Sequence, residues 1–298
     1  MKNRLLSAVV ITLLIVISAA PFSSAGLFGS GDMKSEINFR GSSTLAPVIS
    51  KLSDSFREEY QTWDNVNKDF SEEDIEIFIS AGGSGAGVKS VIDGVSDFGM
   101  VSRNVAEDEK SSIEEYKEYK LGVDALTVSI NPDNKVNQLK ESFSTEEIKN
   151  IFSGEYKYWD DLDSQLPHKE IIVITRDLAG GAHKVFQKKI MGDVDVKSSA
   201  VQSPSMGALC NKIMENQFAI GYASVGVVNR NKGKIVPMKI DGVVPSKENI
   251  VSGSYKVSRP LLVISSGKLS PIEDEFMNYL LSKESASVIE EMGFVPAN

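Results

Sequence analysis

The chain has 298 residues, of which 41% are hydrophobic and 24% charged, a composition that excludes a disordered or collagen-like protein. Its formal net charge of −9 argues against nucleic acid as a partner, because a phosphate backbone repels an acidic surface. One cysteine, Cys210, and two histidines, His168 and His183, exclude an internal disulfide and a cysteine-cluster or histidine-rich metal site, and we expect no cofactor.

The first predicted element is a secretory signal peptide over residues 1–25. Lys2 and Arg4 precede an apolar run, Leu5–Ala20, and Ser23–Ala25 supplies small residues for cleavage. The run is close to membrane-spanning length, so an uncleaved anchor is the alternative. We therefore expect an exported protein, in the periplasm or on the outer face of the cell membrane. Cleavage would remove two cations and take the net charge from −9 to −11, so any bound anion needs local donors.

After this leader, apolar spacing predicts alternating strands and helices, which is typical of an α/β fold with mainly parallel sheets. The expected strands are Ile37–Arg40, Ile75–Ser80, Asp97–Val101, Ala125–Ile130, Ile171–Thr175, Phe218–Tyr222 and Leu261–Ser265. The expected helices are Leu45–Tyr60, Gly87–Ile92, Ser144–Phe152 with a capping box, Ala182–Ile190, Gly207–Glu215, Ser270–Leu281 and Ser285–Met292. Residues 61–74 are polar and are expected to form a loop.

Three segments share one design, in which a strand is followed by a turn of small residues and then by a helix start. They are Gly41–Thr44, Gly82–Gly87 and Ala179–Ala182. Helix starts leave backbone N–H groups free and have partial positive charge, and glycine lets the backbone approach a ligand closely. One such turn is a common helix cap. Three in one chain predict an anion held by several helix starts at once.

The glycine-rich second turn has three rival interpretations. It does not match a nucleotide-binding P-loop, because Val88 fills the lysine position and Lys89 comes one residue late. It does not match a dinucleotide fingerprint, because Gly87 is misplaced as the third glycine. It does not match a hydrolase nucleophile elbow, because Ala86 takes the place of the last glycine, and spacing assigns neither histidine as a base. The chain is therefore expected to bind rather than to catalyse.

Two arginines lie near these turns. Arg176 directly follows the strand over 171–175, and Arg103 follows Ser102 at the end of the strand over 97–101. The guanidinium fork suits a tetrahedral oxyanion, because it donates two hydrogen bonds. A salt bridge is the alternative for each arginine, with Asp177 as the partner available to Arg176.

Taken together, the motifs resemble those of one known family. They are Gly41–Pro47, the run Gly82–Arg103, Ile151–Gly154 with Trp159, Ile220–Tyr222, and Tyr255 with Arg259–Leu261, in that order over nearly the whole chain after the leader. This set resembles the phosphate-binding proteins of bacterial and archaeal ABC transporters, the PstS type. The resemblance implies two α/β lobes of the periplasmic-binding-protein kind, with the ligand in the cleft between them. Lobe 1 would hold residues 34–124 and 224–298, and lobe 2 would hold residues 125–223.

The resemblance also implies a function and a set of ligand contacts. The protein would be a monomer that captures inorganic phosphate by hinge closure and hands it to an ABC transporter permease. The family's contacts map onto Ser43 with Thr44, and onto Ser84, Ser102 and Arg176. With their neighbours in the turns, the candidate ligand-binding residues are Ser43, Thr44, Leu45, Ser84, Gly85, Ser102, Arg103, Arg176, Gly180, Gly181 and Ala182.

Two positions depart from the family's pattern. The third turn reads Gly180-Gly181-Ala182 where the family usually has Ser-Gly-Thr, so two hydroxyl donors are missing. Ser102 stands where some members have an aspartate that accepts the proton of hydrogen phosphate and so rejects sulfate. Two alternatives therefore stay open: the same fold binding sulfate, molybdate or another oxyanion, and a phosphate-sensing binding domain without a transporter.

Overall fold

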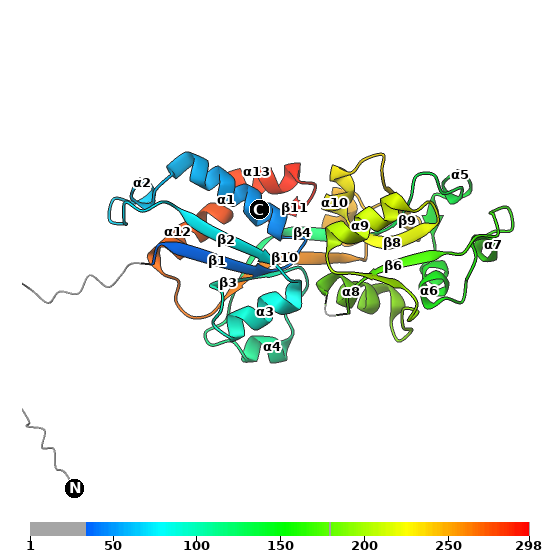
Figure 1. Ribbon diagram of the computed structural model, residues 1–298, viewed down its shortest axis with the longest axis horizontal. Coiled ribbons are helices and arrows are strands. Elements are labelled where there is room, and N and C mark those ends of the chain that lie inside the picture. Colours follow the sequence, from blue (N-terminus) through cyan, green and yellow to red (C-terminus); the bar gives the residue numbers. More distant parts are fainter. Residues whose placement is uncertain (1–33, 179, 298) are drawn as a thin grey trace, which may run out of the picture. The chain divides into compact units, whose positions relative to one another are not determined.

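The structure, a computed structural model, describes residues 34–178 and 180–297, and the predicted signal peptide over 1–25 lies outside them. Two groups of strands, each flanked by helices, lie side by side in the part described (Figure 1). No helix among the described residues is long and apolar enough to cross a membrane.

The first group of strands forms lobe 1. β1 (Glu36–Gly41) lies between β2 (Glu76–Ala81) and β3 (Phe98–Val101), and both pairings are parallel. β10 (Ser258–Ser265) pairs antiparallel with β3 and with the first part of β4 (Lys117–Ile130). The flanking elements are α1 (Ala46–Tyr60), α2 (Trp63–Val66), α3 (Ser84–Ile92), α4 (Glu107–Ser111), α12 (Pro271–Leu280), α13 (Lys283–Glu291) and β11 (Val295–Pro296).

The second group of strands forms lobe 2. β8 (Ala219–Ser224) pairs antiparallel with the second part of β4 and parallel with β6 (Ile172–Arg176), which in turn pairs parallel with β7 (Val201–Ser203). The remaining elements are α5 (Val136–Leu139), β5 (Ser142–Phe143), α6 (Thr145–Ser153), α7 (Trp159–Leu162), α8 (Gly181–Phe186), the π-helix η1 (Gln187–Met191), α9 (Met206–Glu215), α10 (Val225–Arg230), β9 (Val236–Ile240) and α11 (Lys247–Val251).

The chain passes between the lobes at two adjacent places. β4 pairs with β10 as far as Ala125 and with β8 from Leu126 onward. The return passage lies beside it, because the N–H of Leu126 donates to the carbonyl of Val257, the residue before β10, at 2.8 Å. Each lobe has its own hydrophobic core, with Trp63 fully buried in lobe 1 and Trp159 fully buried in lobe 2. The expectation of a two-lobed α/β fold is confirmed.

The core packing bears on where the lobes divide. Val225, Tyr255 and Val257 are buried in the core that also contains residues 125–223. The predicted boundary put residues 224–298 in lobe 1. In the structure α10 follows directly on β8, and β9 pairs antiparallel with β4.

Most expected elements are present, and the differences have identifiable causes. The capping box of α6 is confirmed, since Ser144 Oγ accepts from the N–H of Glu147 at 3.1 Å and Glu147 Oε2 accepts from the N–H of Ser144 at 2.8 Å. α3 begins at Ser84 rather than Gly87, because glycines carry no apolar periodicity by which a helix start can be located. Residues 61–74 include α2, and the helix expected over 182–190 is α8 continued by η1.

Candidate anion-binding site

The first turn depends on a glycine where three elements meet. Gly41 ends β1 with φ = 138°, and a Cβ at this position would lie 2.2 Å from the carbonyl oxygen of Met100 and 2.9 Å from Cα of Gly87. No side chain fits there, because β1, β3 and α3 approach one another at backbone distance. The carboxyl ends of β1 and β3 and the start of α3 are therefore held together.

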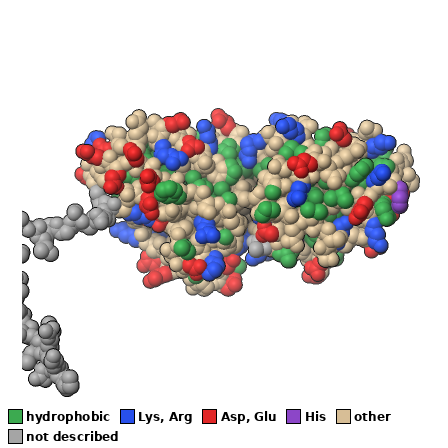
Figure 2. Space-filling view, viewed as in Figure 1, with side chains coloured by type: hydrophobic (Ala, Val, Ile, Leu, Met, Phe, Trp, Pro, Cys, Tyr) green, Lys and Arg blue, Asp and Glu red, His purple; other side chains and the backbone are tan. Residues whose placement is uncertain are grey.

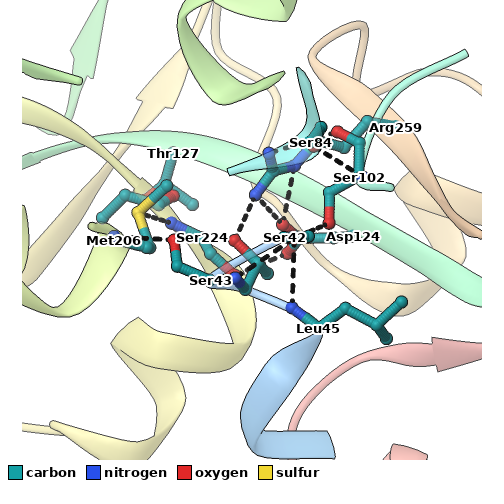
Figure 3. Close-up of polar contacts among 12 residues, drawn as sticks. Ser42, Ser43, Leu45, Ser84, Ser102, Asp124, Thr127, Met206, Ser224 and Arg259 are labelled. Carbon is teal, nitrogen blue, oxygen red and sulfur yellow. Dashed lines mark hydrogen bonds and ion pairs between the residues drawn. The ribbon is translucent and has the colours of Figure 1, made fainter. Parts of the chain in front are cut away.

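The side chain of Ser42 forms hydrogen bonds within this turn. Its Oγ accepts from the N–H groups of Thr44 and Leu45, each at 3.2 Å, and lies 2.5 Å from Ser102 Oγ (Figure 3). The N–H groups of the predicted donors Thr44 and Leu45 are thus shared with a hydroxyl that was not among the candidate residues. Ser102 is fully buried at the end of β3, so the first turn and the β3 end form one polar unit.

Ser43 reaches across from lobe 1 to lobe 2. Its Oγ accepts from Arg176 Nη1 at 3.2 Å and from the N–H of Met206 at 3.3 Å. Because both contacts are donated to this oxygen, the hydroxyl hydrogen of Ser43 stays free to bind an acceptor. A bound oxyanion is such an acceptor.

The second turn follows the same plan. Gly83 has φ = 87° and precedes α3, whose first residue is Ser84. Ser84 is buried, and its Oγ accepts from the N–H of Ser102 at 3.0 Å. Within residues 34–178 and 180–297, no acceptor holds its hydroxyl hydrogen. Gly85, the second residue of α3, adds one of the N–H groups that a helix start leaves without a partner inside the helix.

The third turn belongs to lobe 2 and contacts the second turn directly. Gly181 begins α8, and a Cβ on it would lie 2.3 Å from Ser84 Oγ. A Cβ on Gly180 would lie 3.2 Å from Arg176 Nη2. Glycine at these two positions therefore lets Ser84 and the guanidinium of Arg176 come against the backbone. Ala182 follows as the second residue of α8.

Arg176, the last residue of β6, is almost fully buried and held along its whole length. Its Nε donates to the carbonyl of Ser203 at 3.1 Å, and its Nη2 donates to Asp177 Oδ2 at 2.9 Å and to the carbonyl of Pro204 at 3.0 Å. The salt-bridge alternative is met, because Arg176 is paired with Asp177, and its Nη1 also donates to Ser43 Oγ, while ligand contact stays a prediction. Its position is fixed before any ligand arrives, which lowers the cost of ordering it on binding.

A buried polar cluster of Tyr222, Thr175 and His183 contacts the backbone of Arg176. Tyr222 OH accepts from the N–H of Arg176 at 2.9 Å and lies 2.7 Å from Thr175 Oγ1 and 3.2 Å from His183 Nδ1. Burial raises the pKa of Tyr222 to about 12, so the phenol stays neutral. Burial also lowers the pKa of His183, although Asp177 and Asp195 act against this.

A second buried arginine, Arg259, belongs to a motif of the resemblance but was not among the candidate ligand-binding residues. Arg259 of β10 and Asp124 of β4 form an ion pair at the passage between the lobes, with Nε and Nη2 of Arg259 at 2.9 and 2.7 Å from Asp124 Oδ2. The other Asp124 oxygen accepts from Ser224 Oγ at 2.9 Å (Figure 3). Arg259 Nη2 also donates to Thr44 Oγ1 at 2.9 Å, and its Nη1 donates to the carbonyl of Ser102 at 3.3 Å. The pair thus holds the first turn to the β3 end.

Arg103 differs from the other candidates. Its Nη1 and Nη2 donate to the carboxylate of Glu109 at 2.6 and 2.7 Å, and its Nη1 also donates to the carbonyl of Asn104 at 2.9 Å. The structure therefore has the salt-bridge alternative, because a glutamate on α4 lies within reach of the guanidinium. Ser43, Ser84, Ser102, Arg176 and the third turn converge, whereas Arg103 is directed to α4.

Two lobes that meet through small-residue turns, with hydroxyls and one arginine converging between them, define a class of protein that closes around a small solute. A model of the PBP superfamily domain matches residues 29–284, and the chain belongs to that family.

Sequence relatives and solved structures show which members of the family this chain is similar to. The phosphate-binding protein PstS of Staphylococcus epidermidis is 29% identical over 307 residues, which cover 99% of this chain and 89% of the relative. A putative phosphate ABC transporter substrate-binding protein with bound phosphate, from Clostridium perfringens, has a TM-score of 0.75 at 25% identity and covers 88% of this chain and 100% of that one. An ABC-type phosphate transport receptor from Vibrio cholerae has a TM-score of 0.66 at 23% identity, covering 87% and 99%. The resemblance to the PstS type is confirmed.

Proposed function

We propose that the protein is an extracytoplasmic substrate-binding protein that captures inorganic phosphate by hinge closure and delivers it to the permease of an ABC importer. The relatives named PstS and the phosphate-bound neighbour from Clostridium perfringens support phosphate as the ligand. The observation that carries the proposal is that Ser43 and Ser84 of lobe 1 meet Arg176 and Gly181 of lobe 2. Binding needs no covalent step, so we propose no enzymatic activity.

The proposed mechanism replaces the hydration shell of a tetrahedral dianion with fixed donors. Three donors are proposed to bind the anion first: the hydroxyl hydrogens of Ser43 and Ser84 and the guanidinium of Arg176. Their other contacts already hold them in place. The N–H groups at the starts of α1, α3 and α8 add partial positive charge. The proposed ligand-binding residues are Ser43, Thr44, Leu45, Ser84, Gly85, Ser102, Arg176, Gly180, Gly181 and Ala182.

The division into lobes and the cellular setting are part of the proposal. We place lobe 1 at residues 34–124 and 258–297 and lobe 2 at residues 125–257, because the two main hydrophobic cores divide there except at Val295, which is buried with the core of lobe 2. The protein acts as a monomer in the periplasm or on the outer face of the membrane, and Lys2 and Arg4 with the following apolar run support export.

Titration calorimetry with phosphate and the Arg176→Gln variant tests this function. The native protein is expected to bind tighter than about 10 μM. Arg176→Gln is expected to weaken binding at least about 100-fold, because it removes charge-assisted hydrogen bonds to the dianion. Arg57→Gln is the matched control, since Arg57 forms only a surface ion pair with Asp54 on α1. Millimolar binding by the native protein, or equal binding by both variants, contradicts the proposal.

A second candidate is another oxyanion on the same site, and it is favoured because the described part of the site has no spare carboxylate. Ser102 Oγ pairs with Ser42 Oγ, while Asp124 and Asp177 are each held by an arginine. A site without a free carboxylate acceptor does not repel a fully deprotonated anion such as sulfate. Thermal-shift measurements with phosphate, sulfate and molybdate separate the two candidates, and stabilisation by phosphate alone rejects the second.

A further inference from the structure

A cavity of about 270 Å³ lies between the lobes beside the candidate site. From lobe 1 it is lined by the segment from Arg103 to Glu109 and by the start of β10, including Arg259. From lobe 2 it is lined by Lys184 of α8 and by Lys188 and Lys189 of η1. The π-helical turn over 187–191 continues α8, so one helical segment brings all three lysines to the same cavity.

The charges of this cavity do not balance. Among its charged lining residues Arg259 is neutralised by Asp124, and Arg103 by Glu109. The three lysines are exposed, and none of them forms an ion pair with a residue in the described ranges. The cavity thus has three uncompensated positive charges in a chain whose net charge is −9. Acidic side chains instead crowd the end of the molecule that holds α2 and β1 (Figure 2).

The cavity is next to the turns that bind the anion in the proposed function. Arg259 lines it and also donates to Thr44 Oγ1 at 2.9 Å, so one guanidinium borders both places. Lys184 lies in the first turn of α8, and its N–H donates to the carbonyl of Gly180 at 3.2 Å. Burial would raise the pKa of Glu109, but the hydrogen bond from Arg103, with help from the charge of Lys184, lowers it. Lys184 and Glu109 thus border the same cavity from opposite lobes.

We propose that this cavity, the lysine vestibule formed by Lys184, Lys188 and Lys189 with Arg103 and Arg259, is a capture site that concentrates small multivalent oxyanions and feeds them to the turns. A concave surface lined by one sign of charge focuses the field and raises the association rate without changing the contacts of the final complex. Such an effect weakens as salt screens it, over about 10 Å at 0.1 M ionic strength. The inference rests on the proposed function, and it explains how an acidic protein attracts an anion.

Stopped-flow association of phosphate tests the vestibule with two charge-matched variants. Lys184→Gln/Lys188→Gln/Lys189→Gln removes the vestibule charges, and Lys135→Gln/Lys232→Gln/Lys283→Gln removes three exposed lysines elsewhere. At low salt the vestibule variant is expected to associate about tenfold more slowly, with a flatter dependence on ionic strength and a dissociation rate within about twofold of the native value. The control is expected to keep most of the native association rate. Equal slowing in both variants overturns the inference.

A second measurement is independent of tight binding at the turns. The measurement follows the backbone amide NMR signals of residues 184–189 while phosphate is added to the Arg176→Gln variant. If that variant does not fold, native protein already saturated with phosphate is used instead. Saturable shifts that are absent with chloride at equal ionic strength, and absent in the vestibule variant, support the capture site. Identical responses to both salts overturn it. If the native protein lacks tight binding while these shifts persist, the proposed function fails and the vestibule stands.

Discussion

At the scale of single residues, the ion pair of Arg259 and Asp124 determines how the first turn is held. Both side chains are completely buried, and burial lowers the pKa of Arg259 and raises that of Asp124, so each depends on the other to stay charged. Arg259 also donates to Thr44 Oγ1, which leaves the hydroxyl hydrogen of Thr44 to point elsewhere. We therefore regard the pair as positioning residues for the first turn.

A double-mutant cycle separates this positioning from simple stability. Asp124→Asn is expected to lower the free energy of unfolding by about 3 kcal/mol, because it leaves a buried guanidinium unpaired. Adding Arg259→Gln is expected to restore part of that stability, since the unpaired charge is gone, but not the phosphate affinity, because Thr44 and Ser102 lose their donor. Urea unfolding and calorimetry on the same variants supply the two readouts. Affinity that recovers together with stability would contradict a positioning role.

A residue of the candidate site was predictable when the sequence pattern that marks it lies next to it in the chain. Ser43, Ser84 and Arg176 were predictable, because each follows a strand and adjoins a turn of small residues. Asp124 and Arg259 sit inside strands and are 135 positions apart, so no local pattern pairs them. Arg103 also lies near the end of a strand, two residues beyond β3, and only the fold reveals that Glu109 takes its guanidinium.

At the scale of elements, α8 links the candidate site to a buried histidine. His183 lies in the first turn of this helix, two residues after Gly181, and its Nδ1 is 3.2 Å from the Tyr222 hydroxyl that holds the N–H of Arg176. Burial keeps the ring neutral by lowering its pKa. A proton on His183 would therefore disturb both the helix start and the strand end that form the third turn.

This arrangement predicts how stability depends on pH. An unfolded histidine takes up a proton near pH 6.5, roughly, but folded His183 does so only at lower pH, so the unfolded chain binds more protons. Its contribution to stability is thus complete above about pH 6.5 and is lost as the pH falls below that value. Thermal unfolding of the phosphate-free protein between about pH 5 and 8 measures the slope. His183→Gln is expected to flatten it.

The second histidine supplies the control for this measurement. His168 lies beside Asp160 near α7, with 68% of its side chain exposed. His168→Gln is the matched substitution at an exposed ring, and its slope is compared with that of His183→Gln. If both variants flatten the slope equally, the decline does not originate at His183.

Element boundaries were predictable where a cap or an apolar period marks them. The capping boxes place the starts of α6 and α12 correctly. β4 extends from Lys117, eight residues before the expected strand, because its first part is an alternating strand with polar residues on one face and was not recognised. α10 was missed as well, since Val225–Arg230 is short and directly follows β8 without a turn signal.

At the scale of the whole molecule, the two lobes have separate cores but share their central strands. β4 belongs to both sheets, and the return passage at Val257 is hydrogen-bonded to it. The buried pair of Asp124 and Arg259 lies at this passage. Unfolding one lobe would expose that pair and strip β4 of half its partners, so we expect the lobes to unfold together.

The two tryptophans of the chain test this cooperativity, because Trp63 is buried in lobe 1 and Trp159 in lobe 2. In Trp159→Phe the fluorescence reports lobe 1, and in Trp63→Phe it reports lobe 2. Within each variant, the urea transitions followed by fluorescence and by far-ultraviolet circular dichroism are expected to coincide. A fluorescence midpoint that precedes the circular dichroism midpoint in either variant would show independent lobes.

The resemblance over nearly the whole chain was enough to predict two lobes, but not where the second passage falls. The boundary at residue 224 came from the resemblance and stays a prediction. The segment Val225–Ile240 forms a further helix and strand, and β9 pairs with β4 before the return passage at Val257. Which lobe a segment joins depends on which core its apolar side chains fill, and the sequence pattern alone does not specify the core.

The last described strand offers a fixed point for measuring motion. Val295 and Pro296 of β11 pair with Val123 and Gly122, and a Cβ on Gly122 would lie 2.4 Å from the carbonyl oxygen of Val295. The tail is thereby fastened to β4, the strand that pairs with both lobes and about which closure is proposed. A fluorophore appended behind it should move little during closure, which makes this end a suitable stationary reference for energy-transfer distances to a dye at the far tip of either lobe.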